Sequence, residues 1–194
     1  MRTVLVDCYL QDSESKMIYY RQMIKSHSDI VEVKLCELKS DFDLSGIDAV
    51  VLSGSQWMIS ETEPDRQLQE FIRQLNIPTL GICFGHQLLA RSFGAVVKKG
   101  ELIEREEKIR INKRLEIFAG FDSAVVMRES HQEYVTPESI LKINWQIGAE
   151  SDSCPVEAIR HPQLPIYGVQ FHPERSKENG EKLFANFYHL VLGK

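Results

Sequence analysis

The sequence lacks several features that would place it in common functional classes. No apolar run approaches the length of a membrane span, and the N-terminus lacks the long apolar core of a signal peptide. Neither a P-loop nor a glycine-rich dinucleotide-binding motif is present. We therefore expect no contact with a membrane, no bound cofactor and a cytoplasmic location.

An excess of basic charge is also missing. Lys and Arg total 23 against 28 Asp and Glu, which gives a formal net charge of −5. A nucleic-acid-binding surface needs a basic stripe, so we expect no nucleic-acid partner. The four cysteines form no Cys-x-x-Cys pair, which excludes a disulfide framework or a zinc site. Cys8 and Cys36 are predicted to be buried at strand ends, and Cys154 lies in a polar loop.

The first half of the chain alternates between strand-like and helix-like segments. Strands are expected at 3–8, 30–36, 48–52 and 78–82, and helices at 15–27, from Pro64 onward and after Cys83. Such alternation predicts crossover connections and a mostly parallel sheet. The length suits one α/β domain, which we expect to span residues 1–194.

The second half has a different character. Short strand-like runs follow one another without a long helix, at 95–97, 101–111, 124–128, 156–160 and 166–171. An amphipathic helix is expected at 178–192. We interpret this half as an antiparallel or mixed extension of the parallel sheet. The charge run from Glu104 to Lys108 is interpreted as a solvated strand rather than a binding patch.

The stretch Gly81-Ile82-Cys83-Phe84-Gly85-His86-Gln87 lies between a predicted strand and a predicted helix. This arrangement is typical of a nucleophile elbow, in which glycines allow a sharp turn that projects one side chain. That side chain is Cys83. The alternative is a small buried cysteine in a glycine-rich corner.

A cysteine nucleophile needs a base, and the base needs an orienting partner. His172 ends the predicted strand 166–171, and Pro173 after it favours an extended conformation at His172. In extended backbone Glu174 would face the same side as His172, so its carboxylate could orient the imidazole. Cys83, His172 and Glu174 all follow strands, at the edge of an α/β sheet where ligands bind.

Oxyanion stabilisation is the third requirement of such chemistry. The backbone N–H of Phe84 is one natural donor, because it follows the nucleophile at the start of a helix. A second donor is expected from the loop after the predicted strand 48–52, near Gly54 and Ser55.

The elbow, the stretch from Gly168 to Glu174 and the loop at Ser53-Gly54-Ser55 together resemble the class I, triad-type glutamine amidotransferases. The resemblance spans nearly the whole chain and implies a flavodoxin-like, three-layer α/β fold. It also implies hydrolysis of the side-chain amide of L-glutamine through a Cys83 thioester, with no metal required. Gln87 and the backbone of Ser130 and His131 match positions that bind the substrate glutamine in this family.

The sequence departs from the family pattern at two places. The oxyanion loop of the family commonly reads Ser-Gly-Gly-Pro, so a positive φ at Ser55 would be strained and the oxyanion hole poorly formed. The stretch Ser130-His131-Gln132-Glu133 only partly matches a Ser-His-x-Asp stretch typical of the branch that serves GMP synthase.

The resemblance favours a subunit that supplies ammonia to a separate synthetase such as GMP synthase. Two alternatives remain at this point: a γ-glutamyl hydrolase or peptidase with the same triad, and a non-catalytic regulatory subunit on this scaffold.

Overall fold

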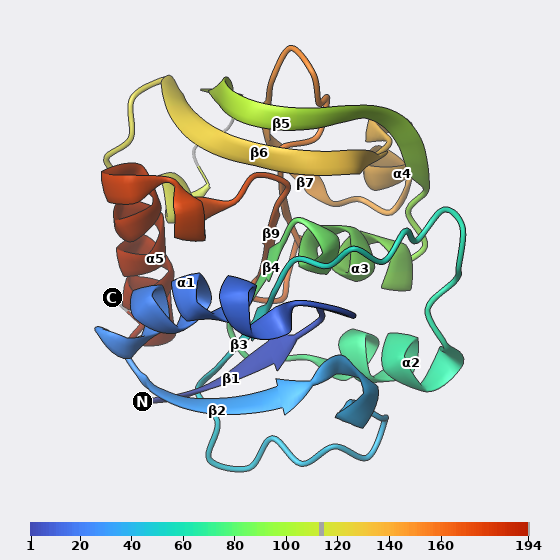
Figure 1. The fold of residues 1–194 in the computed structure, drawn as a ribbon, viewed down its shortest axis with the longest axis vertical. Helices are drawn as coiled ribbons and strands as arrows, with labels where there is room; N and C mark the ends of the chain where they lie inside the picture. Colours follow the sequence, from blue (N-terminus) through green and yellow to red (C-terminus); the bar gives the residue numbers. More distant parts are fainter. Residues whose placement is uncertain (113–114, 194) are drawn as a thin grey trace.

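A computed structural model describes residues 1–112 and 115–193 (Figure 1). One nine-stranded sheet runs through them in the order β2-β1-β3-β4-β9-β8-β7-β5-β6. The strands are β1 (Arg2–Asp7), β2 (Asp29–Lys34), β3 (Ala49–Leu52), β4 (Thr79–Ile82), β5 (Val97–Ile111), β6 (Ala124–Val135), β7 (Gln146–Glu150), β8 (Ala158–Arg160) and β9 (Ile166–Val169). The helices are α1 (Ser13–Lys25), α2 (Arg66–Gln74), α3 (Phe84–Ser92), α4 (Pro137–Lys142) and α5 (Lys177–Val191), with 3₁₀ turns η1 (Leu35–Glu37), η2 (Glu116–Phe118) and η3 (Pro173–Arg175).

Strands β2, β1, β3, β4 and β9 pair in parallel, which brings their carboxyl ends to one edge of the sheet. The chain adds β2 on one side of β1 and β3 on the other. This reversal of strand order is the topological switch point at which open α/β sheets bind ligands. The α/β class predicted from the sequence is confirmed, with its parallel core and its antiparallel extension through β8, β7, β5 and β6.

Alternating side chains of the parallel strands build a core on each face of the sheet. Val4 and Val6 pack with α2 and α3, whereas Leu5 between them packs with α1 and α5. The strands are therefore apolar throughout, because neither face meets water. Helices α1 and α5 lie side by side in Figure 1 and contact each other.

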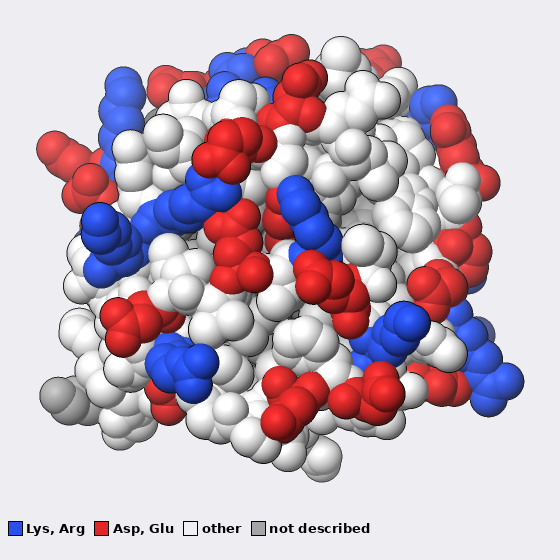
Figure 2. Space-filling model, turned by 60° about the horizontal axis from the view of Figure 1, so that its bottom comes forward, with Lys and Arg blue, Asp and Glu red and all other residues white. Residues whose placement is uncertain are grey.

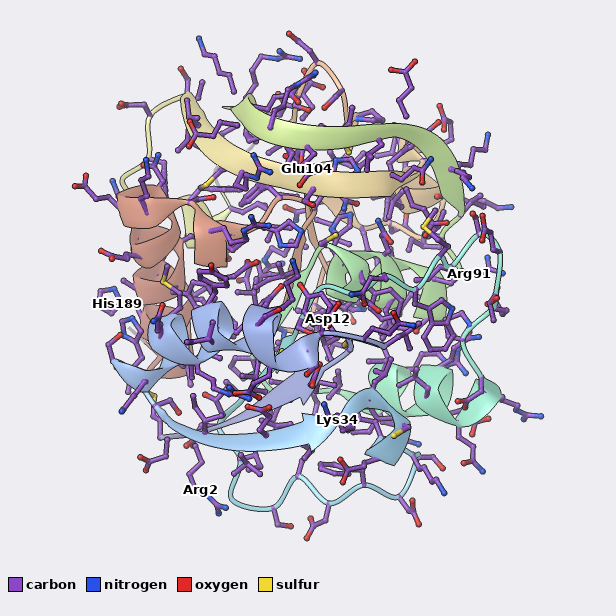
Figure 3. The ribbon with its side chains drawn as sticks, viewed as in Figure 1. Arg2, Asp12, Lys34, Arg91, Glu104 and His189 are labelled. Carbon is purple, nitrogen blue, oxygen red and sulfur yellow. The ribbon has the colours of Figure 1, made fainter. Side chains whose placement is uncertain are left out.

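The antiparallel extension curls back over the parallel core. The long β5–β6 hairpin lies across the top of the molecule in Figure 1. An isolated antiparallel bridge joins Arg128 of β6 to His172, just beyond β9. Figure 3 labels Glu104 on this extension and Lys34 near the opposite end of the molecule, where Lys34 forms an ion pair with the buried Asp7.

Several local predictions are wrong in instructive ways. The expected strand at 95–97 is the start of β5, and α4 and β7 were not anticipated. Helix α2 begins at Arg66 rather than at Pro64, because the Asp65 carboxylate caps it by accepting from the Leu68 N–H at 2.9 Å. Cys36 is exposed rather than buried, since β2 ends at Lys34 and Cys36 lies in η1.

The surface carries both charge signs. On the face drawn in Figure 2, Lys and Arg side chains are interspersed with Asp and Glu. None of the described helices is long and apolar enough to span a bilayer.

Candidate functional site

Cys83 occupies a strained turn between β4 and α3. Its φ of 53° and ψ of −104° are unusual for a residue with a Cβ, and such conformations cost about 1–3 kcal/mol. The glycines on either side permit the turn. A Cβ at Gly81 would lie 2.5 Å from the Gly85 carbonyl oxygen, and a Cβ at Gly85 would lie 2.5 Å from that of Leu52. The backbone therefore forms the nucleophile elbow that the sequence predicts.

His172 and Glu174 lie next to this turn. The imidazole Nδ1 is 2.7 Å from Oε1 of Glu174, and both side chains are buried. Nδ1 is thus held by the carboxylate, and Cys83 lies within hydrogen-bonding reach of the imidazole. Burial disfavours the charged imidazolium, but the negative charges of Glu174 and of a Cys83 thiolate outweigh it and hold the pKa of His172 well above its usual value.

The local reason for the His172–Glu174 contact differs from the one expected. Pro173 opens the 3₁₀ turn η3 instead of extending the chain, so the i,i+2 alternation of a strand does not apply. Within this tight turn the two side chains still converge. The backbone of His172 is fixed by its N–H, which donates to the Arg128 carbonyl at 2.8 Å.

The loop after β3 places only one of its two candidate amides near the site in an unbonded state. The Gly54 N–H donates to the Tyr20 hydroxyl at 3.0 Å. Within the described residues, neither the Ser55 N–H nor the Phe84 N–H donates to a protein acceptor. Ser55 does not have a positive φ, so the strain expected there is absent. Its hydroxyl instead fixes the loop by donating to the Cys8 carbonyl at 2.6 Å.

Ser130 contributes its backbone to the site. Its carbonyl oxygen lies 3.8 Å from the Cys83 sulfur and 3.4 Å from Nε2 of His172. The His131 side chain is buried away from this pocket, with Nε2 3.3 Å from the Glu129 carboxylate. Burial lowers the pKa of His131, so the ring is neutral near pH 7.

Gln87 is buried and does not line the cavity beside Cys83. Its amide Nε2 donates to the Glu133 carbonyl and to Oε1 of Gln170, each at 3.0 Å. Gln170 in turn directs its Nε2 at the Cys83 sulfur, 3.6 Å away. Gln170 was missed in the sequence, although it precedes His172 by two residues at the end of the same predicted strand.

Glu133 is a second residue whose importance the sequence concealed. Its carboxylate accepts from the N–H groups of Ile59 and Ser60, each at 2.8 Å, and anchors the segment beyond the loop of Ser55. The buried residues of β6 alternate strictly from Val125 to Val135. Extending the Val125–Met127 alternation along the sequence would have predicted that Glu133 faces inward.

A cavity of about 160 Å³ opens above Cys83 at the carboxyl edge of the parallel strands. Its walls are Tyr9, Lys16, Tyr19, Ser55, Gln56, Cys83, Ser130, His172, Glu174 and Arg175. They come from the segments after β1, β3, β4 and β9, from α1 and from β6. The described residues contain no group of three or more His, Cys, Asp and Glu side chains placed to hold a metal ion.

A buried thiol, an imidazole held by a carboxylate, and unbonded backbone amides beside a small cavity define a cysteine-nucleophile site of the acyl-transfer type. The sequence model of the family described as "Glutamine amidotransferase class-I" matches residues 4–191. The chain belongs to this family, and the resemblance inferred from its motifs is confirmed.

Relatives with assigned names narrow the comparison. A subunit of the glutamine-hydrolysing GMP synthase of Pyrococcus abyssi is 39% identical over 143 residues, which cover 73% of this chain and 74% of that protein. The protein of the same name from Archaeoglobus fulgidus is 34% identical over 165 residues, 82% of this chain and 85% of that protein.

The solved structure of a candidate GMP synthase subunit from Thermoplasma acidophilum is similar throughout. It superimposes with a TM-score of 0.83 at 28% identity and covers 100% of this chain and 94% of the other.

Proposed function

We propose that this protein hydrolyses the side-chain amide of L-glutamine at Cys83 and delivers the ammonia to a separate synthetase subunit, of which GMP synthase is the first candidate. The observation that carries the proposal is the arrangement of His172 between Glu174 and Cys83. The names of the relatives support the same reaction and the same kind of partner.

In the first half of the proposed reaction, His172 takes the thiol proton of Cys83 while Glu174 holds the other ring nitrogen. The thiolate attacks the amide carbon of glutamine. The carbon–nitrogen bond then breaks, and the imidazolium returns its proton to the departing nitrogen, which leaves as ammonia. In the second half, His172 deprotonates a water molecule that cleaves the thioester and releases glutamate.

The oxyanion formed in each half needs donors near Cys83. The N–H of Phe84 and the N–H of Ser55 are the proposed pair, because each lacks a protein acceptor among the described residues. Gly54 supports the loop rather than the oxyanion, since its amide is bonded to Tyr20. Removing one such donor typically costs about 10²–10³ in kcat.

Substrate binding is proposed at the Ser130 carbonyl, which faces the cavity and can accept a hydrogen bond from the α-ammonium group of glutamine. Gln87 and His131 are proposed to act on the substrate site through their neighbours. The reason is that Gln87 holds Gln170 against the sulfur, and the buried His131 flanks Ser130. One domain over residues 1–194 and a cytoplasmic location stay predictions from the sequence.

A glutaminase assay tests the proposal. Cys83→Ala should lower kcat by at least about a thousandfold, because the thioester cannot form. Cys36→Ala is the matched control, since Cys36 is exposed and outside the cavity, and it should retain wild-type activity. Equal rates for wild type and Cys83→Ala would refute the mechanism.

The choice of substrate and acceptor needs two further measurements. Glutamine should be cleaved in preference to γ-glutamyl peptides; the reverse preference would favour a γ-glutamyl hydrolase. Addition of the GMP-forming synthetase subunit should raise the glutaminase rate and yield GMP from glutamine. A failure to adduct Cys83 with a glutamine-analogue electrophile would favour a non-catalytic scaffold.

A further inference from the structure

Two glutamates are buried together inside the curl of the sheet. Glu129 of β6 and Glu157, one residue before β8, both have 0% exposure. None of their four carboxyl oxygens has a hydrogen-bond partner among the described residues. The nearest basic atom is Nε2 of His131, 3.3 Å from Glu129, at an angle that makes no hydrogen bond. A buried ionised carboxylate without such partners costs several kcal/mol, so the pair requires another form of compensation.

A shared proton supplies that compensation. The two carboxyl groups lie close enough to hydrogen-bond to each other once one is protonated. Burial raises the pKa of Glu129 to about 8 and raises that of Glu157 well above its usual value. Near pH 7 the pair therefore retains at least one proton, which can lie between the two carboxyl groups.

The other groups that titrate or carry charge around the pair do not neutralise two carboxylates. They come from β5, from β6, from the loop before β8 and from the segment after β9, and they are Arg105, Glu107, His131, Cys154 and His172. Glu107 adds a further negative charge, although its carboxylate accepts from the N–H and hydroxyl of Ser153. Arg105 is exposed and is 3.2 Å from Glu107, so much of its charge is already engaged.

Glu129 lies between the two residues that hold the proposed base. The carbonyl of Arg128, on one side, accepts the N–H of His172 at 2.8 Å. The carbonyl of Ser130, on the other side, lies 3.4 Å from Nε2 of His172 and 3.8 Å from the sulfur of Cys83. A movement of the Glu129 side chain would therefore be transmitted to both carbonyls.

We propose that Glu129 and Glu157 form a proton-sharing carboxyl pair that positions the segment Arg128–Ser130 against His172, and that loss of the shared proton displaces this segment and lowers glutaminase activity. The two glutamates are positioning residues, because neither touches the reacting atoms. The effect on activity rests on the function proposed above, whereas the sharing of a proton does not.

The first arm of the test is the pH dependence of kcat/KM. Between pH 7 and pH 9 the wild type should lose activity by about tenfold, as expected when one proton with a pKa near 8 is lost. Glu129→Gln keeps a hydrogen bond to Glu157 without a titrating proton, so it should be active at pH 7 and fall by less than about twofold over that range. Glu157→Gln should behave in the same way, and both tests use the full chain.

The second arm measures stability and needs no activity. A carboxyl whose pKa is raised by folding stabilises the folded state below its unfolded pKa and loses this contribution as pH rises through its folded pKa. The urea midpoint of the wild type should therefore fall between pH 5 and pH 9 more steeply than that of Glu129→Gln or Glu157→Gln. His172 remains in every variant, so its own pH dependence cancels in the comparison.

Glu106→Gln is the matched control, because Glu106 is an exposed carboxylate on β5. It should keep both pH profiles of the wild type. Identical stability profiles for wild type, Glu129→Gln and Glu157→Gln would overturn the shared proton. Flattened stability profiles with an unchanged activity profile would overturn the positioning role alone. A protein without glutaminase activity at any pH would overturn the proposed function and leave the stability arm decisive for the pair.

Discussion

The Nδ1 atom of His172 lies 2.7 Å from Oε1 of Glu174, with both side chains buried beside Cys83. A carboxylate in this position fixes the ring orientation and stabilises its positive charge. Glu174→Gln keeps the shape but removes the charge, so kcat should fall by roughly a hundredfold. Glu178→Gln, at an exposed position of α5, should leave kcat unchanged.

The same contact makes a prediction for stability against pH. The pKa of His172 is raised in the folded protein, so the ion pair contributes fully below the unfolded pKa of about 6.5 and is lost as pH rises through the folded value. The difference in urea midpoint between wild type and Glu174→Gln should therefore be larger at pH 6 than at pH 9. A constant difference would show that the charge pair contributes nothing.

Gly85→Ala tests the close packing beneath the elbow. The new Cβ would lie 2.5 Å from the Leu52 carbonyl oxygen, which is backbone and cannot move aside cheaply. We expect a loss of about 1–3 kcal/mol in the free energy of unfolding, together with a large loss of glutaminase activity. Gly100→Ala is the control. Its Cβ would meet only the Tyr134 side chain at 3.2 Å, so denaturant unfolding should show a change below about 1 kcal/mol.

Ser55→Gly restores the glycine that is common in the family, yet it should lower activity. The Ser55 hydroxyl donates to the Cys8 carbonyl at 2.6 Å and accepts from the Trp57 N–H at 3.0 Å. Loss of these bonds, with the added freedom of glycine, loosens the loop and should reduce kcat by roughly tenfold, the equivalent of about one net hydrogen bond. A variant faster than the wild type would show that serine impairs the oxyanion hole.

Glu133→Gln tests the anchor of the segment after Ser55. The charged acceptor for the N–H groups of Ile59 and Ser60 becomes a neutral amide with one acceptor oxygen. Since hydrogen bonds to charged groups contribute about 1.5–3 kcal/mol, we expect a loss of roughly 2 kcal/mol in unfolding free energy. Glu101→Gln, an exposed carboxylate on β5, should produce no measurable change.

Local patterns in the sequence were sufficient to predict the parallel strands and the grouping of Cys83, His172 and Glu174. Apolar runs and glycine spacing encode these features directly. The bond from Gly54 to Tyr20 could not be predicted, because it depends on how α1 packs against the sheet. The burial of Glu157 was equally hidden, since only the curl of the extension covers it.

The bridge between Arg128 and His172 also constrains when the site can come into existence. Gln170 reaches the sulfur of Cys83 across 87 positions of sequence, and Ser130 reaches it across 47. Contacts between such distant segments form late in folding, after their loop-closure entropy has been overcome. A chain growing from the ribosome would thus carry Cys83 as an ordinary thiol until residues near its end have joined the sheet. Hydrolysis of glutamine would begin only in a completed molecule, so no partly made protein would release ammonia.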